Sequence, residues 1–120
     1  MLATPKNDSS IAAVNFAEVL ERFDGDRDLL AELFGIFRED YPGQIRNAQQ
    51  AITQKDAAEV ERSGHSLKGA LGNLSAIRAF ALAGELEAMG RSGNLALAGP
   101  KLMQVEDELQ RVMDAFDSMP

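Results

Sequence analysis

The sequence contains no cysteine and only one histidine among its 120 residues. Without cysteine, the chain has no disulfide framework, no thiolate metal site and no catalytic thiol. A single imidazole excludes metal sites that need two or more. Tryptophan is absent and tyrosine occurs once, so we expect no aromatic platform for single-stranded nucleic acid. No apolar run approaches the roughly 20 residues of a membrane span, and the N-terminus lacks a hydrophobic signal core.

Positive charge is also scarce, because 12 lysines and arginines are outnumbered by 19 acidic residues, for a net charge of -7. This balance argues against a nucleic-acid groove, which needs a basic stripe. The length fits one domain, and 45% hydrophobic residues are enough for a core. The composition predicts a soluble, acidic single domain with no nucleic-acid or membrane partner, which we expect to be monomeric and cytoplasmic.

Hydrophobic periodicity predicts an all-α fold, namely an antiparallel four-helix bundle with a short additional N-terminal helix. Residues 1–13 show no period and are predicted to form a flexible arm, and 14–118 form the domain. The expected helices are 15–23, a second helix that follows a cap at Asp26 and continues through Ile52, 55–73, 75–91, and a last helix that begins either near Asn94 with a bend at Pro100 or at Pro100 itself.

Local signals mark the ends of several of these helices. Asn15 and Asp26 are suited to cap the first and second helices, and Pro42 is expected to kink the second. Between the third and fourth helices, Asn73 is the expected terminator and Ser75 the expected cap.

The helix over 55–73 carries its histidine on the side opposite its apolar stripe. At about 3.6 residues per turn, the stripe is formed by Val60, Leu67, Leu71 and Leu74. His65 points away from it, with Lys68, Gly69 and Gly72 beside it and Gly64 on the flank. Three helical glycines cost roughly 2–3 kcal/mol relative to alanine, so we expect them to admit another surface. Close helix–helix packing is the alternative explanation.

An exposed histidine on a face of small residues suggests a nucleophile presented to a partner protein. At its ordinary pKa of about 6.5, a substantial fraction of imidazole is neutral at pH 7 and has a free ring nitrogen. Lys68 is one turn from His65 and is a suitable cation for a phosphoryl group on that nitrogen. The chain has no phosphate-binding loop for a nucleotide. The phosphate must therefore come from another protein.

Three segments carry a resemblance to a known family: HSLKGA at 65–70, GNLSA at 72–76, and LEAMGR at 86–91. Together they resemble the histidine-containing phosphotransfer (HPt) domain of multistep two-component phosphorelays, and the similarity extends over most of the chain. The resemblance implies that His65 is phosphorylated and that Lys68 lies beside the phosphate. One departure is Ser75, because many members have glycine there.

The resemblance also implies roles for the remaining site residues. Glu87 stands where several members carry a glutamine or glutamate that holds the other ring nitrogen, and Arg91 stands where a basic residue often follows. An ordinary surface ion pair between Glu87 and Arg91, four residues apart, is the alternative. A docking face for the receiver would comprise Gly64, Gly69, Gly72 and Arg91.

By this resemblance, His65 accepts a phosphoryl group from a receiver-domain aspartyl phosphate and passes it to another receiver aspartate. The chain would be a phosphocarrier without kinase activity, and whether it counts as an enzyme is left open. Its partners would be response-regulator receiver domains and a hybrid sensor histidine kinase. It would need no cofactor or metal of its own, because the receiver supplies Mg²⁺. The alternative is a non-phosphorylated helical module that docks a partner through the glycine-rich face.

Overall fold

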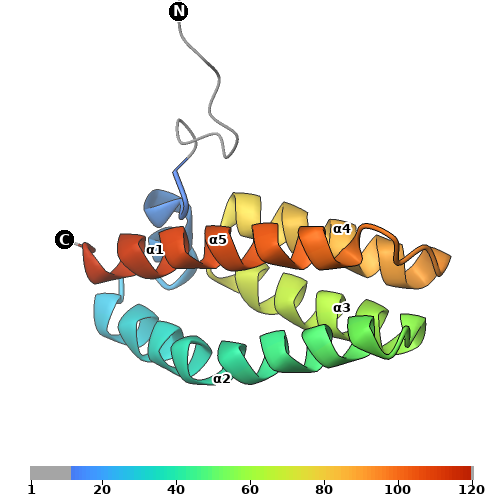
Figure 1. Cartoon of the computed structure of the whole chain (residues 1–120). Helices are drawn as coiled ribbons and strands as arrows, with labels where there is room; N and C mark the ends of the chain where they lie inside the picture. Colours follow the sequence, from blue (N-terminus) through green and yellow to red (C-terminus); the bar gives the residue numbers. More distant parts are fainter. Residues whose placement is uncertain (1–11, 120) are drawn as a thin grey trace, which may run out of the picture.

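A computed structural model describes residues 12–119 of the chain. Over this range the protein contains five helices and no strand, which confirms the all-α class. They are α1 (Phe16–Arg22), α2 (Arg27–Thr53), α3 (Ala57–Asn73), α4 (Ile77–Ser92) and α5 (Ala98–Asp117). Figure 1 shows α2 to α5 side by side with alternating directions, and the short α1 near one end. None of the described helices is both long enough and apolar enough to cross a membrane.

Side-chain caps begin the first three helices. The Asn15 side chain accepts a hydrogen bond from the Glu18 backbone N–H (3.1 Å), and Asp26 accepts one from Leu29 (3.0 Å). Both bonds satisfy backbone donors that have no acceptor within the helix. The two predicted caps are therefore confirmed, and Asp56 caps α3 in the same way.

The two helical prolines are accommodated differently. α2 continues through Pro42 as one helix, and Figure 1 shows it bending along its length, as expected where a proline removes a hydrogen bond. α5 begins at Ala98, so neither predicted start at Asn94 or Pro100 is correct. Pro100 is the third helical residue, where its missing N–H has no intrahelical partner to lose.

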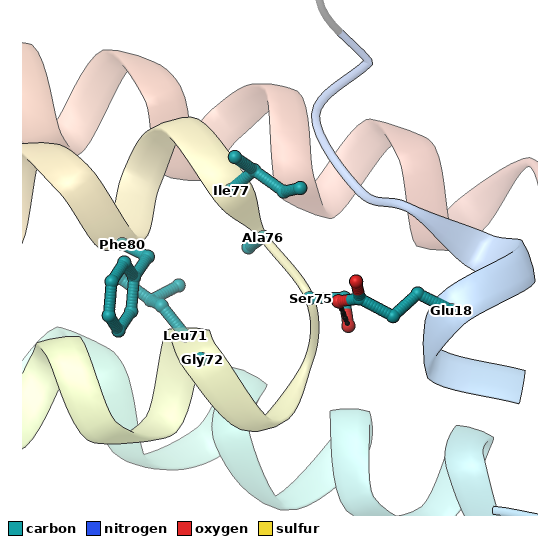
Figure 2. A pocket seen from close by; sticks show the side chains of 7 residues that line it. All are labelled: Glu18, Leu71, Gly72, Ser75, Ala76, Ile77 and Phe80. Atoms are coloured by element: carbon teal, nitrogen blue, oxygen red, sulfur yellow. Dashed lines mark hydrogen bonds between the residues drawn. The ribbon is translucent and has the colours of Figure 1, made fainter. Parts of the chain in front are cut away.

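The turn between α3 and α4 also differs from the prediction. α3 ends at Asn73 as expected, but α4 begins at Ile77, and no side chain caps it. Ser75 is buried with φ +53°, a left-handed conformation that glycine adopts most easily. Its hydroxyl donates to Glu18 of α1 (2.7 Å; Figure 2) instead of capping α4. The hydrogen bond from Ser75 to Glu18 thus connects this turn to α1.

The apolar faces of all five helices meet in one core. The predicted stripe of α3 is buried over its whole length: Val60, Leu67, Leu71 and Leu74. At one end of the core, the Phe116 ring stacks on Phe34 with a centroid distance of 4.1 Å and meets Phe16 edge-on at 5.2 Å. These contacts join α1, α2 and α5.

The N-terminal boundary of the domain needs a correction. Of the predicted flexible arm 1–13, residues 1–11 lie outside the described part of the chain. Ala13 is 7% exposed and belongs to the core, together with Val14. The packed domain therefore begins before residue 14.

Candidate functional site

His65 projects from the middle of α3, and its side chain is 70% exposed. Its Nδ1 lies 2.8 Å from Oε2 of Glu87 on α4. An ionised carboxylate only accepts hydrogen bonds, so Nδ1 carries the proton and donates it to Glu87. Within residues 12–119, Nε2 has no hydrogen-bond partner. The lone pair of the neutral ring is therefore on the nitrogen that remains available.

Glu87 connects the charged groups of the site. Its side chain is 6% exposed; Oε1 lies 2.7 Å from Nζ of Lys68, and Oε2 lies 3.1 Å from Nη2 of Arg91. The hydrogen bond from Lys68 is the main cause that lowers the pKa of Glu87, and the bond from His65 adds to it, whereas burial opposes it. The pair with Arg91 exists, but the buried Glu87 is not part of an ordinary surface ion pair.

Two glycines let α3 and α4 approach closely at this network. A Cβ on Gly64 would lie 2.6 Å from the Glu87 backbone nitrogen, and a Cβ on Gly90 would lie 2.8 Å from the Ala57 carbonyl oxygen and closer still to Glu61. Gly64 is buried. Its predicted place on a docking face is therefore wrong, because its lack of a side chain serves helix packing.

The other two glycines of α3 differ from Gly64. Gly69 is exposed, and nothing lies within 4 Å of the place where its Cβ would be. Gly72 is half-buried beside the ring of Phe80, which a Cβ would approach to 3.2 Å. The ring lines a recess of about 320 Å³ together with Ile77, and Figure 2 shows both side chains. Of the three glycines of α3, Gly69 alone has open space at the position of its Cβ.

Two residues of this network were missed by the sequence analysis. Glu61 of α3 accepts a hydrogen bond from Nε of Arg91 (3.1 Å), and Gly90 makes room for its backbone. Glu61 lies four residues before His65, which places both on nearby faces of one helix. The four-residue spacing between Glu61 and His65 could have indicated that they share a site. The pairing of Glu61 with Arg91 of α4 could not be inferred from the sequence.

The arrangement offers one exposed nucleophilic nitrogen, a fixed proton on the other nitrogen and a lysine nearby. In the part of the chain that the structure describes, no three His, Cys, Asp or Glu side chains are grouped so that they could hold a metal ion. Chemically, the site is suited to receive a group at Nε2 that a partner delivers.

Comparisons with known proteins agree with this geometry. Residues 32–115 match the family model of the Hpt domain. The chain is also similar to the crystal structure of histidine-containing phosphotransfer protein B from Pseudomonas aeruginosa PAO1, with 25% identity and a TM-score of 0.81 over 88% of this chain and 91% of that one. The comparison with curated proteins gave no match. Since the family model covers well over half of its length, the chain belongs to the Hpt domain family.

Proposed function

We propose that His65 is the phosphoacceptor through which this domain performs histidine phosphotransfer in a phosphorelay. The observation that carries the assignment is the pairing of Nδ1 with the buried Glu87, which leaves Nε2 unpartnered on a side chain that is 70% exposed. His65 is also the chain's single histidine. The four long helices, which we interpret as the antiparallel bundle of the family, hold this ring on their outer surface.

The transfer step follows from the placement of the two ring nitrogens. The Nε2 lone pair attacks the phosphorus of a receiver aspartyl phosphate, the N–P bond forms, and the P–O bond to aspartate breaks, which releases a carboxylate. The proton on Nδ1 stays where Glu87 holds it, so the product ring is a phosphoimidazolium that the carboxylate stabilises. Reversal of these steps on a second receiver completes the relay.

Lys68 has a different role in the proposal. Its ammonium group is held by Glu87, one turn from His65, and its flexible stem allows it to turn toward a phosphoryl group on Nε2. The receiver would bring the Mg²⁺, and this chain needs no cofactor of its own. Receiver domains and a hybrid sensor kinase are the proposed partners, with Gly69 offering open space for their approach. Monomeric state and cytoplasmic location remain predictions.

The alternative, a module that docks a partner without phosphoryl chemistry, is not favoured by the site. Such a module does not need a buried carboxylate that fixes the proton of an exposed imidazole. It also predicts that His65→Gln binds and signals as well as the wild type does.

The direct test is incubation of the domain with a phosphorylated receiver labelled on its phosphate. We expect label on the wild type that is acid-labile and alkali-stable, as a phosphoramidate is, and none on His65→Gln. ATP alone should give no label. Acid-stable label, or label that survives the substitution, would contradict the proposal.

A further inference from the structure

The two carboxylate oxygens of Glu87 have different partners. Oε2 accepts hydrogen bonds from Nδ1 of His65 and from Arg91, whereas Oε1 is paired with Lys68. If Lys68 turns toward the phosphoryl group, as proposed above, Oε1 loses its partner during the reaction. Something else must then keep Oε2 against the imidazole.

Arg91 is placed to do this, because it is held at two points. Its Nη2 lies 3.1 Å from Glu87 on its own helix, and its Nε lies 3.1 Å from Oε2 of Glu61 on α3. A planar guanidinium with two sides engaged is held in a defined orientation. The close backbone contact at Gly90 brings Glu61 within reach. Arg91 therefore bridges the two helices behind the Glu87 carboxylate.

We propose that Arg91, anchored by Glu61, is a positioning residue that keeps the Glu87 carboxylate on Nδ1 of His65, both while Lys68 is paired with Oε1 and after Lys68 has left it. The inference rests on the proposed function, because it assigns Nε2 as the reacting nitrogen. The inference gives Arg91 a role in orienting the nucleophile, whereas the family resemblance implied a place on the docking face. Arg91 itself touches neither the imidazole nor the reacting atoms.

The reason that positioning matters is the location of the ring proton. The charged groups linked to the ring through Glu87 are Arg91 from α4, and Lys68 and Glu61 from α3. Without Arg91, the carboxylate is drawn toward Lys68 and its bond to Nδ1 weakens. In the neutral ring, the proton then shifts toward Nε2 and occupies the lone pair that attacks phosphorus.

The test measures the ring tautomer of the unphosphorylated protein by ¹⁵N NMR of the His65 nitrogens, at about pH 8.5, where imidazoles are neutral. For Arg91→Ala, we expect the Nδ1–H to Nε2–H ratio to fall about tenfold, the order expected when a hydrogen bond to a charged group is lost. The ratio in Arg91→Lys should lie between those of the wild type and Arg91→Ala, because one ammonium cannot bridge Glu61 and Glu87 as the guanidinium does. Glu61→Gln should shift the ratio in the same direction.

Two controls match these variants on the neighbouring surface. Arg62 is paired with Glu59 on α3 and does not contact Glu87, so Arg62→Ala and Glu59→Gln remove the same charges nearby. Both controls should keep the wild-type ratio. Because the Arg91 side chain is 63% exposed, its variants should fold, which circular dichroism checks.

Single-turnover transfer completes the experiment. At saturating phospho-receiver, Arg91→Ala should transfer more slowly, in proportion to the lost Nδ1–H form. An unchanged tautomer ratio in Arg91→Ala overturns the proposal. If that variant only requires more receiver for half-saturation, Arg91 is a docking residue. Failure of the wild type to accept phosphate would instead contradict the proposed function, since the tautomer measurement needs no phosphate.

Discussion

Glu87 is the side chain on which the electrostatics of the site around His65 depend. A carboxylate that is 6% exposed is costly to bury unless its charge is compensated. Here Lys68, His65 and Arg91 all contact it. The hydrogen bond from Lys68, followed by the one from His65, outweighs the effect of burial, so the pKa of Glu87 lies below the ordinary value of 4.5. The stability of the domain and the state of its nucleophile therefore depend on the same carboxylate.

The lowered pKa of Glu87 gives a pH prediction with a definite sign. A carboxyl group with a folded-state pKa below its unfolded value adds stability that is complete above the unfolded value. This stability is lost as the pH falls from 4.5 through the folded pKa. We therefore expect the unfolding free energy of the wild type to decrease relative to Glu87→Gln over this acidic range. Thermal unfolding of both proteins between about pH 7 and pH 3 measures the difference.

Glu85→Gln is the matched control, because Glu85 lies on the same helix with its side chain 54% exposed. The difference in unfolding free energy between Glu85→Gln and the wild type should change less with pH than the difference between Glu87→Gln and the wild type. A difference between the wild type and Glu87→Gln that stays constant from neutral to acidic pH would refute the prediction.

Lys68 gives a second prediction at the scale of single residues. Lys68→Met keeps the apolar stem but removes a charged partner from the buried Glu87, so we expect a loss of about 1–2 kcal/mol in unfolding free energy. Transfer to His65 should also slow. Lys101→Met is the control, because the partner of Lys101 is the exposed Glu85. Equal stability losses in the two variants would show that the burial of Glu87 does not matter.

At the scale of helices, the site depends on how closely α3 and α4 approach. Gly64 faces the backbone of Glu87, and Gly90 faces the backbone of Glu61. Each glycine thus lies against a residue that supplies a carboxylate to the network. The distance between the helices and the geometry of the charges are set by the same contacts.

Gly64 and Gly69, both on α3, should therefore respond to alanine with opposite signs. Gly64→Ala would force a Cβ against α4, so we expect a loss of about 1–3 kcal/mol despite the gain in helix propensity. Gly69→Ala meets nothing within 4 Å and should gain up to about 1 kcal/mol. Denaturant unfolding of both variants measures the two effects. Losses in both would place Gly69 in a packed interface.

Gly69 also tests the approach of the receiver without loss of stability. Gly69→Gln should stay at least as stable as the wild type, yet accept phosphate from a receiver markedly more slowly, because a long side chain fills the open space beside His65. The slowing should be smaller in Gly69→Ala. Transfer at the wild-type rate in Gly69→Gln would show that receivers do not use this space.

At the scale of the whole molecule, the network around His65 comes from α3 and α4, whereas a second buried carboxylate lies on α5. Glu108 of α5 is 2% exposed and accepts two hydrogen bonds from Arg111, and Arg78 of α4 lies 3.7 Å away. This buried carboxylate links α4 to α5. None of its partners belongs to the network around His65.

Stability and transfer should therefore separate in Glu108→Gln. Removing a buried charge from its two arginines should cost about 3 kcal/mol of unfolding free energy. Below the melting temperature, the transfer rate should equal that of the wild type. Asp107→Asn, at the exposed neighbouring position, is the control and should change neither quantity. A slower transfer in folded Glu108→Gln would mean that α5 influences the site.

The sequence by itself determined what depends on near neighbours in the chain. The apolar stripe of α3 and the caps at Asn15 and Asp26 were predicted correctly, because periodicity and capping act within one or two turns. For the same reason, His65 and Lys68 could be placed on one face, three residues apart. The start of α4 was misjudged, because Ser75 is held in its left-handed turn by Glu18 of a distant helix.

The tertiary structure decided what depends on a second helix. A helical wheel shows which side of α3 is apolar, but it does not show which residue of α4 lies opposite each position. The burial of Gly64 and the bridge from Arg91 to Glu61 depend on that register. The bond from His65 to Glu87 depends on it too, and before the structure it was implied by the family resemblance alone. Register is set by close packing across the whole interface between the helices, and no local pattern in either segment encodes it.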